Sequence, residues 1–299
     1  MLNSLLTVAF LSQCLRISVP YAFPALGATF SERGGVVNIA LEGILLISAF
    51  AATVGTYFTG SPLFGVVCGI AAGGLTAFLH GLITITLKAD QIVSGIGINL
   101  LAVGLTKFCC QLIFNSSSNS DRIAGIDQWS FFGSIPILDN PFVILIFILA
   151  IVMQFVLFKT RFGLRLRSVG EFPAAAESLG VNISRMRHAG VVISGVMTGI
   201  GGAWLAFNQH SFTDGMSAGR GFIALAAMII GKWNPLGALA ACLLFGIAES
   251  LSIQLQSTSQ YIQFIQLIPY VVTMIVLAGF IGRAVPPAAD GIPYEKDAA

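Results

Sequence analysis

Charged residues are scarce in this chain of 299 residues: they make up 9% of the sequence, whereas 56% of the positions are hydrophobic. A soluble globular chain carries about 25% charged residues, so this one lacks the side chains needed for a hydrated surface. The net charge of +2 comes without a basic run interleaved with aromatic residues, which excludes a typical nucleic-acid-binding surface. The composition therefore predicts an integral membrane protein, and no nucleic acid is expected among its partners.

Sequence signals for a metal or a nucleotide are also missing. The five cysteines all lie within apolar segments and lack the spacing of metal ligands, so each is expected to pack as a small hydrophobic side chain. The chain has no Gly-x-x-x-x-Gly-Lys-Ser/Thr sequence, the loop that usually holds the phosphates of ATP. We therefore predict a protein without a metal, a cofactor or an ATP site of its own.

Long apolar runs fill most of the chain. A helix needs about 20 apolar residues to cross a bilayer. The first run lacks basic residues before it and a cleavage site after it, which favours a retained helix, interrupted by Pro20 and Pro24. The predicted fold is all-α and polytopic, with a membrane domain over residues 1–285 and a polar C-terminal tail over 286–299. The domain contains eight apolar regions, at 4–30, 36–58, 63–87, 92–114, 141–158, 189–208, 236–254 and 262–282.

Basic residues are concentrated in one connecting loop. Residues 159–188 hold six of the fifteen lysines and arginines. Because short loops rich in Lys and Arg stay on the cytoplasmic side, this loop is predicted to be cytoplasmic, and 115–140 to be external. Residues 221–231 form an apolar run only half as long as a span, which predicts a re-entrant or broken helix.

Small residues recur along two of the apolar runs. A four-residue spacing places them on one face of a helix, where they let two helix backbones approach closely. Both runs are therefore predicted to be sites of tight helix packing. The first run has Gly65, Gly69, Gly73, Ala77 and Gly81, and the second has Gly195, Gly199 and Ala203.

The sequence SERGGVVNIALEG, residues 31–43, places polar groups in an apolar part of the chain. Two glycines end the preceding helix, and Asn38 and Glu42 then stand four residues apart, on one face of the helix expected to follow. A carboxylate near the bilayer centre costs at least about 2.5–3.5 kcal/mol, so Glu42 is expected to face a cavity or another protein group. Two interpretations stay open: these residues line a solute path, or Glu42 pairs with Arg33 or caps backbone groups.

Two further carboxamides, Asn99 and Asn208, lie in or next to apolar runs. A buried carboxamide needs partners, and it offers a donor and an acceptor together. Each of them therefore either contacts a polar solute or forms a hydrogen bond between helices.

The basic loop contains a short helix signal, from Glu171 to Gly180. Pro173 suits the first position of a helix, Glu171 lies at the positive end of its dipole, and Gly180 suits its C-terminal stop. The resulting helix of about seven residues is too short to span a bilayer. It is expected to fit a groove in a partner, or else to be part of a linker on anionic lipid headgroups.

Taken together, these segments resemble the permease subunits of bacterial ATP-binding-cassette (ABC) importers. The likeness is to the branch that carries branched-chain amino acids, simple sugars and nucleosides, and to its nucleoside-type permeases above all. It runs from LGATFSERGGVVNIALEGILLISAF through QIVSGIGINLLAVGLT and RFGLRLRSVGEFPAAAESLGV to GRGFIALAAMIIGKWNPLGALAACLLFG. The resemblance thus covers nearly the whole chain.

The resemblance implies a transport subunit of the bacterial cytoplasmic membrane rather than an enzyme. Its partners would be membrane lipid, a second and related permease chain, an ATPase that uses ATP and Mg²⁺, and a solute-binding protein or lipoprotein. The solute would be a nucleoside, with a purine nucleoside expected first and riboflavin or a simple sugar as alternatives. The path residues would be Asn38, Glu42, Asn99 and Asn208, and the ATPase-coupling residues Arg167, Glu171, Pro173, Ala174, Ala175, Glu177 and Gly180.

Two other classes of function remain for comparison. Residues Gly215–Gly219 match the Gly-x-Ser-x-Gly pattern of hydrolases, but that motif requires a strand-turn-helix elbow, and here it joins two apolar runs. A proton-coupled secondary transporter is the second alternative, although titratable residues within the spans would be expected for it rather than a loop that docks a partner.

Overall fold

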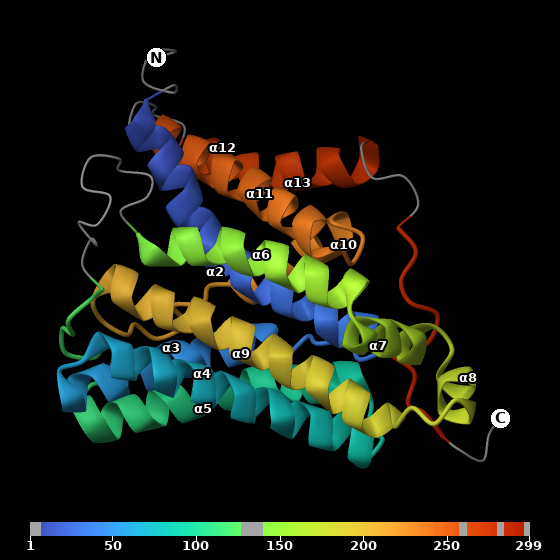
Figure 1. Ribbon diagram of the computed structural model, residues 1–299. Helices are drawn as coiled ribbons and strands as arrows, with labels where there is room; N and C mark the ends of the chain where they lie inside the picture. The colour runs from blue at the N-terminus through green and yellow to red at the C-terminus, as the bar shows by residue number, and fades with distance from the viewer. Residues whose placement is uncertain (1–6, 127–139, 257–261, 280–283, 296–299) are drawn as a thin grey trace.

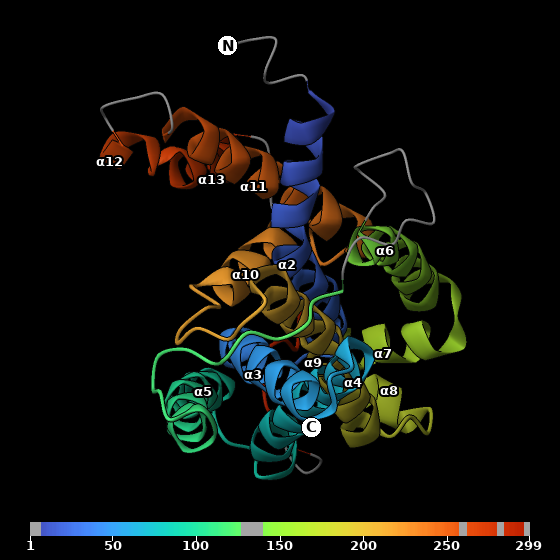
Figure 2. The same ribbon diagram turned by 90° about the vertical axis from the view of Figure 1, so that its left-hand side faces the viewer.

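The computed structural model describes residues 7–126, 140–256, 262–279 and 284–295, and within these ranges every regular element is a helix (Figure 1). Helices α3, α4, α5 and α9 form one group; α2 packs on α9; α6, α10 and α11 pack on α2; and α12 and α13 pack on α11 (Figures 1 and 2). The helices are α2 (Val8–Arg33), α3 (Leu41–Thr59), α4 (Pro62–Gly81), the π turn η1 (Leu82–Thr86), α5 (Gln91–Phe114), α6 (Pro141–Lys159), α7 (Arg161–Glu171), α8 (Pro173–Ser178), α9 (Ile183–Gln209), α10 (Arg220–Ile230), α11 (Pro235–Gln256), α12 (Ile262–Ile265) and α13 (Ile268–Gly279).

The predicted all-α membrane fold is confirmed. Among the residues that the structure describes, six helices are long and apolar enough to cross a bilayer, namely α3, α4 with η1, α5, α6, α9 and α11. The region predicted over 4–30 is represented by α2, with 26 residues, and the region over 262–282 by the short helices α12 and α13. The half-length run at 221–231 is α10, with 11 residues.

The predicted interruption of the first region at Pro20 and Pro24 is wrong. Helix α2 continues through both prolines, which are buried. Each proline removes one backbone donor from the helix, but such losses are tolerated where neighbouring helices cover the backbone. Helices α9, α10 and α11 all pack against α2, so the protein interior replaces lipid around this part of the helix.

The two stripes of small residues pack against each other and form a glycine seam between α4 and α9. A Cβ atom added to Gly73 would lie 2.5 Å from the carbonyl oxygen of Gly195, and one added to Gly199 would lie 2.7 Å from that of Gly69. Backbone therefore lies against backbone, as the spacing predicts. We use the name glycine seam for Gly69 and Gly73 of α4 with Gly195 and Gly199 of α9.

Replacing Gly195 with alanine is expected to destabilise the protein by about 1–3 kcal/mol, because the new methyl group would enter backbone and side-chain atoms of α4. The matched control is Gly97→Ala in α5, where an added Cβ would meet nothing within 4 Å. Alanine favours a helix over glycine, so this control should leave stability unchanged or slightly higher. Thermal unfolding of the two purified variants measures the difference, and equal melting temperatures would contradict the described seam.

Candidate functional site

The helix that follows SERGGVVNIALEG begins deep inside the bundle. Residues 36–40 do not form a helix, and α3 starts only at Leu41. Gly43 lies against Asn99 of α5, which is eight residues after the first residue of α5, Gln91. At 1.5 Å per residue, Gly43, the third residue of α3, therefore lies about 12 Å along α5 from its first residue. A non-helical stretch of backbone thus lies at the depth of the helices.

Glu42 joins the start of α3 to the start of α10. Its two carboxylate oxygens accept hydrogen bonds from the backbone N–H groups of Gly219 and Gly221, each at 2.7 Å. Backbone donors at the start of a helix lack partners in their own helix, and a carboxylate there also suits the helix dipole. Of the two interpretations of Glu42, the structure shows the backbone cap. The alternative, a pairing of Glu42 with Arg33, is not found: Arg33 Nη1 lies 3.8 Å from a carboxylate oxygen of Glu171.

Glycine at position 221 is required by this joint. A Cβ atom there would clash with the backbone nitrogen and Cα of Glu42. Gly219 has a φ of +81°, a left-handed conformation that few residues other than glycine adopt. The close approach of α3 and α10 therefore depends on two glycines as well as on one carboxylate. We call Glu42, Gly219 and Gly221 the helix joint.

Asn38 is not on a helical face with Glu42, and this prediction is wrong. Asn38 lies in the non-helical stretch before α3, fully buried, and its amide donates to Ser194 Oγ of α9 at 3.0 Å. The stretch is non-helical, and side chains from other helices replace its lost helical hydrogen bonds. Gln91 accepts from the Val37 N–H at 2.7 Å, and a ring nitrogen of His80 lies 3.1 Å from the Val37 carbonyl oxygen.

Asn99 of α5 also hydrogen-bonds the backbone around the start of α3. Its side-chain oxygen accepts from the Gly43 N–H at 2.8 Å, and its amide donates to the Ile39 carbonyl at 3.0 Å. Asn208, in contrast, lies near the end of α9, where its oxygen accepts from Arg16 of α2 at 3.3 Å. Three of the four predicted path residues are thus gathered around the start of α3, and Asn208 is apart from them.

Sequence reasoning missed Arg220, which lies between the two glycines of this joint, and Tyr21 of α2. The Tyr21 hydroxyl of α2 donates to the carboxylate of Glu249 of α11. The Arg220 guanidinium, at the start of α10, donates to the carbonyls of Met216 and Ser217 at 3.0 and 3.4 Å. Glu249 stands among apolar residues in the sequence, which indicates a buried polar contact. Nothing in the sequence identifies Tyr21 as its partner.

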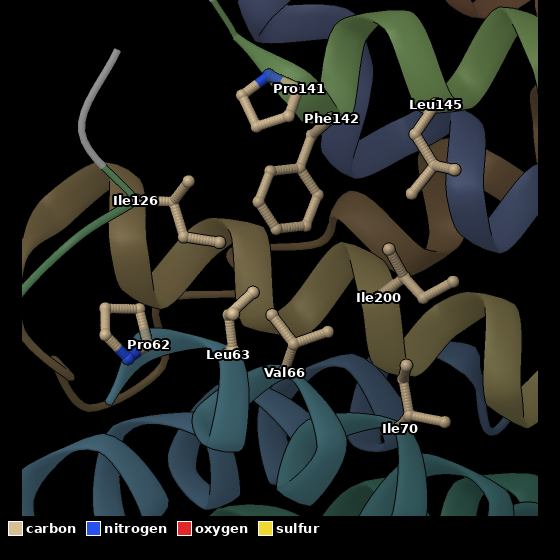
Figure 3. A pocket seen from close by; sticks show the side chains of 9 residues that line it. All are labelled: Pro62, Leu63, Val66, Ile70, Ile126, Pro141, Phe142, Leu145 and Ile200. Carbon is tan, nitrogen blue, oxygen red and sulfur yellow. The ribbon is translucent and has the colours of Figure 1, made fainter. Parts of the chain in front are cut away.

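A pocket with a different character lies away from this joint (Figure 3). It is a cavity of about 410 Å³ between α4, α6 and α9, and every residue that lines it is apolar. A polar solute would find no side-chain hydrogen-bond partner in it. The lining residues are Pro62, Leu63, Val66, Ile70, Ile126, Pro141, Phe142, Leu145 and Ile200.

The basic loop folds into α7 and α8 at one end of the bundle, which we call the basic end (Figure 1). Helix α8 begins at Pro173 and ends at Ser178, close to the predicted limits. Gly180 has a φ of +80°, and its N–H donates to the Glu177 carbonyl at 2.8 Å, a typical C-terminal cap. Ala174 and Ala175 are exposed on α8, and Ala176 is buried beneath it.

Arg167 and Glu171 hold α7 against the bundle. Arg167 donates from Nε to the Leu157 carbonyl at 3.1 Å, and its guanidinium lies 4.9 Å from the centre of the Phe158 ring. Glu171 lies near Arg33 at the end of α2. Among the predicted coupling residues, Ala174 and Ala175 therefore face outward, whereas Arg167 attaches α7 to the end of α6.

Residues 10–277 match the family described as the branched-chain amino acid transport system permease component. The chain belongs to this family. It is 42% identical to the guanosine ABC transporter permease NupQ of Bacillus subtilis, over 95% of this chain and 98% of that one. It is 43% identical to the nucleoside ABC transporter permease NupC of Lactococcus lactis, over 93% and 94% of the two chains. The resemblance to ABC permeases is thus confirmed.

A structural likeness agrees with this family. A metal-chelate type ABC transporter in an inward-facing conformation matches the fold with a TM-score of 0.51 at 17% identity, covering 90% of this chain and 84% of that chain. At this identity the likeness supports the fold alone. Together with the six apolar helices, family membership makes the chain a multi-pass permease of the bacterial cytoplasmic membrane, not an enzyme.

Second permeases from the same two bacteria match less closely. The guanosine ABC transporter permease NupP of B. subtilis is 28% identical over 80% of this chain. The nucleoside ABC transporter permease NupB of L. lactis is 23% identical over 80%. Both bacteria therefore have a pair of permeases in which one member resembles this chain more strongly.

The hydrolase alternative is wrong. Residues Gly215–Gly219 form turns between α9 and α10, not a strand followed by a helix. The last of these glycines donates its N–H to Glu42. The glycines thus serve the helix joint, and the family of the chain is one of transport components.

Proposed function

We propose that this permease is one of two different membrane subunits of an ABC importer for nucleosides. The observation that carries the proposal is the 42–43% identity to NupQ and NupC over nearly their full lengths. The weaker matches to NupP and NupB favour a related chain, rather than a second copy, as the partner. A separate ATPase using ATP and Mg²⁺ and an external solute-binding protein or lipoprotein complete the system.

The helix joint supports an uncharged solute. The start of a helix normally attracts anions, because its first N–H groups lack acceptors and the helix dipole is positive at this end. At α10 the carboxylate of Glu42 already occupies two of these donors. We infer that the joint helps to shape the solute path near α10, and that it leaves the path without a free anion site.

The basic end is proposed to be cytoplasmic and to bind the ATPase through α8. The six basic residues of the loop favour this side of the membrane. Exposed apolar side chains surround α8, with Phe172 71% and Leu179 85% exposed. Such side chains, together with the outward Ala174 and Ala175, suit a groove on another protein better than contact with water.

Uptake of a nucleoside is expected to require ATP but no proton gradient. The test is uptake of labelled guanosine by membranes containing this permease, its partner permease, the ATPase and the binding protein, with and without a protonophore. A purine nucleoside should compete with guanosine, whereas ribose and riboflavin should not. Uptake that persists without ATP and stops with the protonophore would establish a secondary transporter, and competition by riboflavin or ribose would reassign the solute.

A further inference from the structure

The short helix α8 has few contacts of its own. Its six residues cannot form a stable helix alone, so packing must hold it in place. The buried side chains at this point form a small cluster of Val169, Ala176 and Ile183, separate from the main core. An aromatic ring from the C-terminal segment, Tyr294, packs against this cluster. The tail that was expected to be a polar appendage therefore contributes to the packing of α8.

The backbone of this C-terminal segment is fixed to α7 and α9. The Ala289 N–H donates to the Gly170 carbonyl at 2.8 Å. Arg187, which is buried near the start of α9, donates to the carbonyls of Ile292 and Ala289 at 2.9 and 3.5 Å. Two different helices thus hold a segment that has no regular secondary structure of its own.

Side-chain contacts extend the attachment to α8. The Tyr294 hydroxyl donates to the Glu177 carboxylate at 2.7 Å, and the Ala288 N–H donates to Glu171 at 3.2 Å. The hydrogen bond to Glu177 raises the pKa of the Tyr294 hydroxyl. In Figure 1 the segment runs across the basic end, beside α7 and α8.

We infer that residues 284–295 form a strap that holds α8 in a fixed position relative to α7 and α9. Tyr294 is a positioning residue of this strap, because it both covers the cluster under α8 and binds Glu177. The inference rests on the proposed function, in which α8 receives the movement of the ATPase. The chain itself connects α8 to α9 through Gly180 and the exposed Leu179. The strap provides a second connection, because it contacts both Glu177 of α8 and Arg187 of α9.

Tyr294→Ala should lower nucleoside uptake per ATP hydrolysed by about fivefold or more, because it removes both the ring and the hydrogen bond. Tyr294→Phe removes only the hydrogen bond and should lower the same ratio by about twofold to fivefold. The matched control is Ile292→Ala, since Ile292 is 57% exposed and contributes its backbone carbonyl to the strap. All variants are measured in the complete importer, and co-purification of the ATPase reports assembly.

A double-mutant cycle with Glu177→Ala separates positioning from a general loss of stability. If the strap acts through this hydrogen bond, Tyr294→Phe should have little further effect in the Glu177→Ala background. Additive effects of the two changes, or a parental uptake ratio in Tyr294→Ala, would overturn the strap.

Failure of the proposed function gives a different result. If Ala175→Trp on the outer face of α8 leaves ATPase binding and coupling unchanged, α8 does not receive the ATPase. If Ala175→Trp uncouples the importer and Tyr294→Ala does not, α8 keeps its proposed role and only the strap is overturned.

Discussion

Glu42→Ala is expected to lower nucleoside uptake about tenfold or more, with the importer still able to assemble. The carboxylate accepts the N–H groups of Gly219 and Gly221. Removing it would leave two donors without partners inside the protein, at a cost of about 1–3 kcal/mol each. The start of α10 would then separate from α3 or admit water, and the path beside it would lose its shape.

Glu42→Gln distinguishes the charge from the size of the side chain. A carboxamide has one acceptor oxygen and one donor nitrogen, so it cannot accept from both glycines, and uptake should still fall. The matched control is Asp121→Asn, which makes the same chemical change in an exposed loop. Uptake is measured in the full importer and divided by the amount of complex that co-purifies. Parental uptake by both Glu42 variants would show that the joint is unimportant for transport.

Ala175→Trp is expected to weaken binding of the ATPase by about fivefold or more, or to lower its stimulation by solute. Ala175 is exposed on α8, and a bulky ring there would overfill a groove that fits a small side chain. Overpacking of an established contact typically costs about 1–3 kcal/mol, which corresponds to about a fivefold to hundredfold loss of binding. The helix joint is not part of the basic end, so the solute path should stay intact.

A tryptophan at another exposed alanine provides the control for Ala175→Trp. Ala71 is exposed on α4, away from α8, and Ala71→Trp should leave ATPase binding unchanged. The measurements are co-purification of the ATPase and solute-stimulated ATP hydrolysis in reconstituted membranes. An Ala175→Trp importer that assembles and couples as the parent does would restrict α8 to a linker at the membrane surface.

The sequence predicted those features that depend on local pattern. Apolar length predicted the spans, the four-residue spacing of Gly69, Gly73, Gly195 and Gly199 predicted close packing, and Pro173 with Gly180 predicted α8. Each of these signals arises from residues close together in the chain. Their physical basis is the thickness of the bilayer, the size of a side chain and the geometry of a helix end.

The sequence could not predict features that depend on distant partners. Asn38 was predicted to be helical, but Gln91, His80 and Asn99 from other helices hydrogen-bond the backbone of its non-helical segment. Glu42 binds backbone N–H groups more than 170 residues away, and a backbone amide has no signature in a sequence. The docked strap was missed for the same reason, since its attachment consists largely of main-chain groups.

The glycine seam determines which parts of the permease can move during transport. Two helices in backbone contact have no side chains between them that could change rotamer and repack. We therefore expect α4 and α9 to move as a single unit, with bending confined to places where the chain is not helical. Two non-helical stretches adjoin or include the helix joint, at residues 34–40 and 211–219, and we expect a displacement of α9 to be passed to the joint through them.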